Sequence, residues 1–213
     1  MPFCGHATIA TAVALAGRDG VGDLVLESAV GRIPLRTRLS ADGSVVATLT
    51  SVATRSRLAT EAELTEVLSA LRWDRSDLDE RYFPHIGYAG NYHPILVVRT
   101  RERLAALDYD YPVLADLMAR RNWITVDLVW AESATTFHAR NPFPPGGVVE
   151  DPATGATAAA FGGYLRTLGQ ASAPSRLTMF QGEDMGRPSR LEIELQAGEP
   201  GVLVSGTAHR IAD

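Results

Sequence analysis

The sequence predicts an α+β protein of two similar domains, each with a buried helix packed against a mixed β-sheet. Two stretches of small apolar residues, beginning at Gly5 and at Gly155, have the composition of helices that are buried nearly all round. Glycine, alanine and leucine coincide at positions 5/155, 10/160 and 15/165. After each helix come a strand, a Gly-Arg turn, a strand, a turn and a strand. We therefore expect an internal repeat, with one domain at residues 1–110 and another at 111–213.

The first half alternates between helix and strand patterns. Residues 5–16 are apolar nearly all round and stop before a glycine, which predicts a buried helix. Thr60 and Glu63 form a capping-box pattern ahead of apolar residues at helical spacing, which predicts a second helix. Residues 72–81 are charged, and we expect a solvated loop. Short apolar runs bounded by turn residues predict strands at 24–27, 32–39, 45–49 and 94–99.

The second half contains two further helix patterns. Pro112 is typical of a helix start, and we expect the residues on the inner face to be Val113, Leu114, Leu117 and Met118. Residues 141–147 form a turn rich in proline and glycine. Residues 153–168 predict the second small-residue helix. The remaining apolar runs predict strands at 123–130, 135–140, 177–180, 191–195 and 202–211.

Length, charge and hydropathy exclude several classes of function. The 213 residues are 46% hydrophobic and 21% charged, an ordinary globular balance. The formal net charge of -5 disfavours nucleic acid or an anionic membrane as a partner. No apolar run approaches the roughly 20 residues that span a bilayer. No secretory leader pattern follows Met1, so we expect a cytoplasmic protein.

Two residue counts exclude more chemistry. All 20 basic residues are arginine, which removes Schiff-base catalysis on lysine and the lysine-containing phosphate loop. The single cysteine, Cys4, excludes an intrachain disulfide, a multi-thiolate zinc site and a two-thiol mechanism. No Gly-x-Gly-x-x-Gly motif opens a helix, and His85, His93, His138 and His209 show no ligand spacing. We therefore expect neither a metal nor a cofactor.

The densest polar cluster, Glu150 to Gly155, lies at the start of the second small-residue helix. Backbone N–H groups are unpaired there and the helix dipole favours an anion, so a substrate carboxylate could bind at Gly155 and Ala156. Asp151 could then act as an acid or a base. Alternatively, Asp151 or Thr154 only caps the helix.

The segment Cys4-Gly5-His6 forms the matching start of the first small-residue helix. His6 could handle a proton beside a second anion-binding helix end. The alternative is a small buried cysteine next to a histidine that is hydrogen-bonded for structural reasons. Residues 181–189, taken alone, indicate no more than a glycine-rich hairpin.

Three motifs together resemble the phenazine-biosynthesis PhzF-like family of the diaminopimelate-epimerase fold superfamily. They are Pro-Phe-Cys-Gly-His-Ala-Thr at 2–8, Glu-Asp-Pro-Ala-Thr-Gly at 150–155, and Gln-Gly followed by Gly-Arg-Pro-Ser at 181–189. The resemblance covers essentially the whole chain. It implies two pseudo-symmetric domains, each a curved mixed sheet around a central helix, with the active site between them. It also implies a cofactor-independent isomerase that shifts a proton within a small carboxylic acid such as dihydro-hydroxyanthranilate, usually as a homodimer.

The resemblance also implies roles for individual residues. Asp151 and His6 match the catalytic positions, and Gly5, Gly155 and Ala156 match the positions that bind the substrate carboxylate. The family usually has serine where Ala156 stands. A cysteine-based epimerase of the same fold is excluded, because Thr154 replaces its second cysteine.

The principal base of the family is a glutamate in a Ser-Glu-Thr-like segment upstream of the Cys-Gly-His helix, and no residue here matches it. The internal repeat indicates that the same segment is missing. Residues 112–152 precede the second small-residue helix, whereas only residues 1–3 precede the first. We therefore expect a first domain truncated at its N-terminus. A misassigned start, a fragment and an inactive form all remain open. The leading hypothesis is a PhzF-like isomerase, and the alternative is a non-catalytic carboxylate-binding or scaffold protein.

Overall fold

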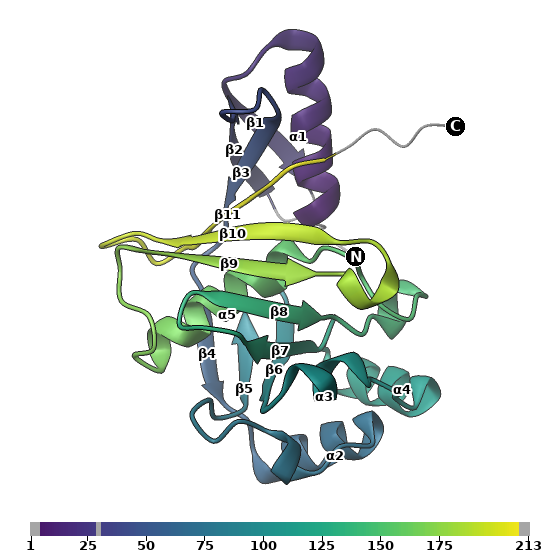
Figure 1. Ribbon diagram of the computed structural model, residues 1–213. Helices are drawn as coiled ribbons and strands as arrows, with labels where there is room; N and C mark the ends of the chain where they lie inside the picture. Colours follow the sequence, from purple (N-terminus) through teal and green to yellow (C-terminus); the bar gives the residue numbers. More distant parts are fainter. Residues whose placement is uncertain (1–4, 29–30, 209–213) are drawn as a thin grey trace.

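The structure, a computed structural model, describes residues 5–28 and 31–208. Within them the strands form one mixed sheet in the order β1-β2-β3-β11-β10-β9-β8-β7-β6-β5-β4 (Figure 1). The pairs β6–β7 and β8–β9 are parallel, and the other neighbours are antiparallel. The strands are β1 Asp23–Ser28, β2 Gly31–Leu39, β3 Val45–Thr50, β4 Arg55–Leu58, β5 His85–Tyr88, β6 Tyr92–Val98, β7 Asp127–Ala131, β8 Thr136–Arg140, β9 Ser175–Gln181, β10 Ser189–Leu195 and β11 Leu203–Gly206.

Helices lie on both faces of this sheet. They are α1 Gly5–Asp19, α2 Glu61–Leu71, α3 Arg101–Ala105, α4 Tyr111–Arg121 and α5 Gly155–Thr167, with 3₁₀ turns at Arg75–Asp77, Pro144–Gly146 and Glu183–Met185. The prediction of a mixed α+β protein is confirmed. The division into domains at residue 110 stays a prediction, because the sheet continues through both halves of the chain.

Helix α5 is the central helix of the molecule, and every residue from Gly155 to Leu165 is buried. It packs against β4 and β5, near one end of the sheet, and also against β10 and β11, on the far side of β7–β9. One helix can touch both groups of strands only if the sheet curves around it. Small residues make this possible: a side chain at Gly162 would contact Ile193, and one at Gly163 would contact Thr54.

Helix α1 packs on β2 and β3 and stands with them to one side of the larger part of the molecule (Figure 1). The expectation that it is buried nearly all round is wrong. Gly5, Thr8, Ile9, Ala12 and Ala16 form one buried face, whereas Ala7, Ala10, Thr11 and Ala14 are exposed. Within the described residues only one sheet face and the start of α5 lie against this helix, so its outer side meets solvent.

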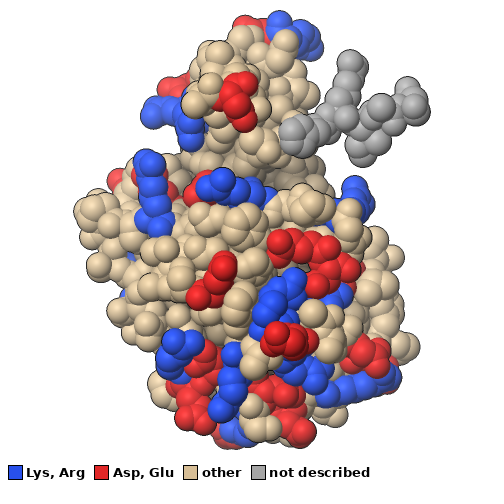
Figure 2. Space-filling model, in the orientation of Figure 1, with Lys and Arg blue, Asp and Glu red and all other residues tan. Residues whose placement is uncertain are grey.

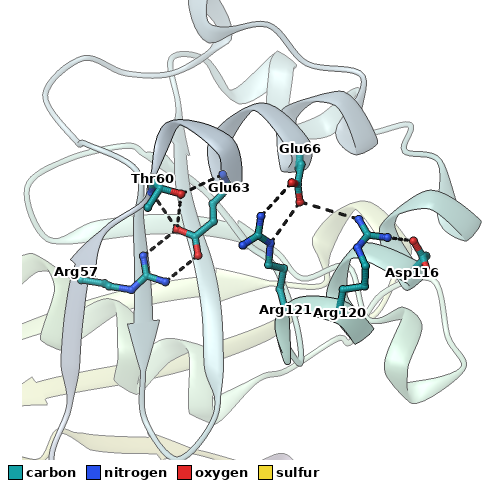
Figure 3. A network of polar contacts seen from close by, with 7 residues as sticks. All are labelled: Arg57, Thr60, Glu63, Glu66, Asp116, Arg120 and Arg121. Atoms are coloured by element: carbon teal, nitrogen blue, oxygen red, sulfur yellow. Dashed lines mark hydrogen bonds and ion pairs between the residues drawn. The ribbon is translucent and has the colours of Figure 1, made fainter.

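Helices α2, α3 and α4 form a layer on the other face of the sheet, around a second hydrophobic cluster that includes Leu71, Leu96, Leu117 and Leu128. The capping box of Thr60 and Glu63 is confirmed. Figure 3 shows that Glu63 also accepts a hydrogen bond from Arg57 of β4, while Glu66 forms ion pairs with Arg120 and Arg121 of α4. Salt bridges therefore connect this layer to the edge of the sheet.

Several local expectations need correction. Residues 72–81 are not a solvated loop, because Trp73 and Leu78 are buried in the second cluster and residues 75–77 form a 3₁₀ turn. Val113 is 50% exposed, since Leu114, Leu117 and Met118 alone occupy the inner face of α4. The sequence patterns missed β4, β5 and α3, which are short. Strand β11 ends at Gly206, and residues 209–211 of the expected strand lie outside the described residues.

Acidic and basic side chains are interspersed over the face of α2, α3 and α4 drawn in Figure 2, without a large patch of one sign on that face. None of the helices in the described ranges has the length and apolar character to cross a bilayer.

Candidate active site

The starts of α1 and α5 meet at Gly5 and Gly155. A Cβ atom built on Gly5 would lie 3.1 Å from Gly155 Cα and 3.3 Å from Ala156 N. Real Cβ atoms rarely come this close to backbone, so glycine at position 5 allows the two helices to touch end to end. The structure thus brings together Gly5, Gly155 and Ala156, which the sequence assigned to carboxylate binding.

His6 and Asp151 face each other at this junction. His6 Nδ1 lies 3.4 Å from Asp151 Oδ1. The side chain of His6 is 45% exposed, whereas that of Asp151 is 7% exposed, so the histidine forms the solvent side of the pair. The second carboxylate oxygen, Asp151 Oδ2, accepts a hydrogen bond of 2.8 Å from the Thr154 hydroxyl. Cys4, the remaining residue of this motif, lies outside the described residues.

The capping interpretation of Asp151 and Thr154 is wrong. Thr154 is the N-cap residue of α5, but its side chain makes no capping hydrogen bond. Its hydroxyl donates to Asp151 instead. The N–H groups of Gly155 and Ala156 have no acceptor among the residues that the structure describes. The start of α5 therefore keeps donors available to an anion.

Gln181, at the end of β9, holds the loop that carries Asp151. Its side-chain amide donates to Asp151 O at 2.6 Å and to Thr154 Oγ1 at 3.0 Å, and its Oε1 accepts from Thr154 N at 3.0 Å. The side chain is 1% exposed. The sequence indicated only a glycine-rich hairpin here. The Gln-Gly pair of the motif was the available signal, but its partner lies thirty residues earlier in the chain.

The opposite side of the loop is fixed by Asn141 and by a buried ion pair. Asp151 N donates to Asn141 O at 3.0 Å. Arg140 Nε donates to Glu150 Oε2 at 2.9 Å, and Arg140 also donates to Ala105 O of α3. Breaking a buried pair by removing one partner is strongly destabilising. Glu150, held by this ion pair, therefore helps to position its neighbour Asp151.

Behind Asn141 lies the carboxyl of Asp127, which is fully buried. Asn141 Nδ2 donates to Asp127 Oδ1 at 3.1 Å. Burial raises the pKa of Asp127 to about 7, and the hydrogen bond from Asn141 opposes this shift. This carboxyl carried no signal in the sequence, because it falls inside an apolar strand pattern.

A narrow cavity opens at the junction of the two helices. The residues that line it are Gly5, His6, Asn91, His93, Ile124, Thr125, Phe143, Asp151, Thr154 and Ala156. They come from α1, α5, the β5–β6 turn, β6, the segment before β7 and the segment between β8 and α5. Sequence reasoning missed Asn91, His93 and Thr125, which tertiary packing brings here from the middle of the chain. Within the described residues no group of His, Cys, Asp and Glu is arranged to hold a metal ion.

The arrangement combines three elements that acid–base chemistry on a carboxylic acid needs. Two helix starts provide a positive potential without a lysine side chain. Backbone N–H groups at Gly155 and Ala156 can receive a carboxylate. A buried carboxylate next to an accessible imidazole can transfer a proton near the bound molecule.

Comparison with known proteins identifies the family of this chain. The family model described as phenazine biosynthesis-like protein, PhzC-PhzF, matches residues 1–213. An uncharacterised isomerase of Mesorhizobium japonicum is 33% identical over 100% of this chain and 75% of its own length. Trans-2,3-dihydro-3-hydroxyanthranilate isomerase of Pseudomonas aeruginosa is 30% identical over 100% of this chain and 74% of its own length.

Solved structures share the fold. A PhzF-family phenazine biosynthesis protein of Bacillus anthracis superposes with a TM-score of 0.81 at 19% identity, covering 97% of this chain and 73% of that one. A predicted epimerase of Pseudomonas aeruginosa gives a TM-score of 0.83 at 24% identity, covering 100% and 73%. The fold and the family model thus define the class, that of the PhzF-like proteins, and the relatives named above are isomerases. The chain belongs to the phenazine biosynthesis-like (PhzC-PhzF) family.

Proposed function

We propose that this protein is a cofactor-independent isomerase that moves a proton within a small carboxylic acid. The observation that carries the proposal is the pairing of Asp151 with His6 at the junction of two helix starts. A relative named trans-2,3-dihydro-3-hydroxyanthranilate isomerase makes that compound the first substrate to test.

In this proposal the substrate carboxylate binds the N–H groups of Gly155 and Ala156. Negative charge that develops on the substrate when a C–H bond breaks is stabilised by the two helix ends. Asp151 and His6 serve as the acid–base pair: the proton leaves one carbon, passes through the pair, and returns to another carbon of the same molecule. No oxidant, reductant or second substrate is consumed.

A second candidate is a non-catalytic protein that binds small carboxylates at the same helix ends. The observation that favours it is that no residue here matches the principal glutamate base of the family. Turnover separates the two candidates, because both require carboxylate binding and only the first requires proton transfer.

We also propose that a further segment, N-terminal to Met1 in the full-length protein, covers the outer face of α1 and supplies the missing base. The exposed alanines of that face support this. In-frame upstream sequence that encodes strands and a Ser-Glu-Thr-like segment is the expected finding. A stop codon directly before the Met1 codon would contradict the proposal. The proposed function also includes a homodimeric state and a cytoplasmic location. Both rest on the resemblance to the family alone.

Two substitutions of Ala156 test the carboxylate site. Ala156→Pro removes one N–H donor from the first turn, where proline is tolerated, as Pro112 in the first turn of α4 illustrates. We expect benzoate affinity, measured by calorimetry, to fall at least 10-fold. Ala156→Ser adds a hydroxyl and should raise affinity by roughly 2- to 10-fold, the effect of one hydrogen bond. Equal binding by wild type and Ala156→Pro would refute the helix-end site.

Deuterium incorporation tests the acid–base pair. Trans-2,3-dihydro-3-hydroxyanthranilate is incubated with the protein in D₂O and followed by NMR. We expect deuterium on carbon with a wild-type chain that includes the proposed upstream segment, and at least 100-fold slower incorporation when this chain carries Asp151→Asn. Asp151→Asn should still bind benzoate. Binding without any incorporation by the upstream-extended wild-type chain would favour the non-catalytic candidate.

A further inference from the structure

His93 is the second residue of β6, and its side chain is completely buried. One ring nitrogen, Nδ1, lies 2.9 Å from Thr125 Oγ1. Because the ring is enclosed and held at one edge, its orientation is fixed before any ligand binds.

The other ring nitrogen, Nε2, is buried and has no hydrogen-bond partner among the residues that the structure describes. A buried polar atom without a partner costs free energy, and proteins rarely retain one without a role. His93 lines the same narrow cavity as Asp151, Gly5 and Ala156. The missing partner is therefore expected from a molecule in that cavity.

The surroundings indicate which kind of partner fits. Burial lowers the pKa of His93 to about 4, so the ring is neutral near pH 7. Nδ1 shares its hydrogen bond with the Thr125 hydroxyl, and either atom can be the donor. In the tautomer with the proton on Nδ1, Nε2 carries the lone pair. A lone pair repels a carboxylate and accepts a hydrogen bond from an amine or hydroxyl.

The two sides of the cavity thus differ in hydrogen-bonding character. Ala156 offers an N–H donor at the start of α5, whereas His93 offers an acceptor at Nε2 when the proton is on Nδ1. The lining also includes the apolar residues Ile124 and Phe143. A ligand with a carboxylate at one end and a neutral hydrogen-bond donor on its carbon skeleton satisfies both sides.

We propose that His93 Nε2 accepts a hydrogen bond from an amine or hydroxyl group of the bound carboxylic acid, and that His93 is thereby a specificity-determining residue. The inference rests on the proposed function, since it presupposes that the carboxylate occupies the helix end.

Three ligands distinguish binding at the carboxylate site from binding at His93. They are benzoate, anthranilate and 3-hydroxybenzoate. Benzoate has the carboxylate alone, and each of the others adds one donor. We expect the wild type to bind at least one donor-bearing ligand roughly 3- to 10-fold more tightly than benzoate, the effect of one hydrogen bond. His93→Phe keeps a ring but lacks the acceptor, so it should lose this preference and retain benzoate affinity within about 3-fold. His93→Gln, whose amide oxygen can accept, should restore part of the preference.

The failures are distinguishable. If the wild type binds none of the three ligands, the proposed function fails and this inference falls with it. If benzoate binds and Ala156→Pro weakens it, but His93→Phe keeps the full preference for donor-bearing ligands, only the role of His93 is overturned. Equal binding of all three ligands by the wild type overturns it as well.

A measurement on the wild-type protein tests the inference even if the His93 variants do not fold. The ¹⁵N resonance of His93 Nε2 reports whether this nitrogen accepts a hydrogen bond. It should shift when a donor-bearing ligand is added and stay nearly unchanged with benzoate. A resonance that responds identically to both kinds of ligand would contradict the inference.

Discussion

At the scale of the residue, the site depends on polar groups buried behind it. Asn141 connects two of them, because its backbone oxygen accepts from Asp151 N and its side-chain amide donates to Asp127. Asp127 Oδ2 and Asn141 Oδ1 have no partner among the described residues. The second layer of the site is therefore incompletely hydrogen-bonded, and its stability depends on the protonation state of Asp127.

Asp127→Asn should make stability less dependent on pH. The folded-state pKa of Asp127, about 7, lies above the ordinary value of 3.8. Between these values the folded protein binds more protons than the unfolded chain, so the stability of the wild type falls as pH rises from about 4 to 7. The asparagine amide does not titrate, so the variant does not lose this stability as pH rises. We expect Asp127→Asn to be more stable relative to wild type at pH 8 than at pH 5, by roughly 2 kcal/mol.

Urea unfolding at the two pH values measures this difference. At pH 5 the wild-type carboxyl is already protonated, so that pH serves as the internal control. An unchanged difference between variant and wild type at pH 5 and pH 8 would show that Asp127 does not titrate in this range.

At the scale of the element, Glu63 fixes α2 against β4. It closes the capping box with Thr60 and accepts two hydrogen bonds from Arg57, at 2.8 and 2.7 Å (Figure 3). Its side chain is 6% exposed. The Arg57 hydrogen bond is the largest cause that lowers the pKa of Glu63 to about 2.

Glu63→Gln should therefore cost stability at neutral pH and little in acid. Since the folded-state pKa lies below the ordinary value of 4.5, the contribution of Glu63 is complete above about pH 4.5 and is lost as pH falls toward 2. We expect a loss on the order of 2 kcal/mol at pH 7 and a smaller difference from wild type at pH 3. Glu66→Gln is the matched control on the same helix. Glu66 is more exposed, so its removal should cost less than about 1 kcal/mol.

Chemical denaturation of both variants at pH 7 and pH 3 provides the comparison. If the two glutamates proved equivalent, the capping box with its Arg57 contact would not be the main attachment of α2.

At the scale of the whole molecule, the contact between Gly5 and Gly155 joins α1 and its strands to the rest of the protein. Gly5→Ala introduces a Cβ 3.1 Å from Gly155 Cα, and backbone atoms cannot move aside as a flexible side chain can. We expect a loss of roughly 1–3 kcal/mol from overpacking, together with weaker benzoate binding, because the two helix ends are forced apart.

Gly17→Ala is the matched control in the same helix. A Cβ at Gly17 meets nothing within 4 Å, and alanine favours the helix, so this variant should gain up to about 1 kcal/mol and bind benzoate normally. Thermal unfolding and calorimetric titration of both variants measure the two effects. Normal benzoate binding by Gly5→Ala would show that the helix contact does not shape the site.

The sequence by itself determined the mixed α+β character, the capping box and the two small-residue helices, because local spacing of apolar, capping and turn residues encodes them. It also identified His6, Asp151, Gly155 and Ala156, since helix starts with glycine and acidic residues have a recognisable composition. The roles of these residues in catalysis and binding stay predictions.

Only the tertiary structure decided that α1 is exposed on one side, that Gln181 and Asn141 hold the loop of Asp151, and that His93 lines the cavity. These features depend on contacts between residues that are far apart in the chain. A histidine in an apolar strand has the same local pattern whether its ring ends in a core or at a ligand. Here β6 packs against the segment before β7, which places Nδ1 2.9 Å from Thr125 Oγ1 and leaves Nε2 without a hydrogen-bond partner among the described residues.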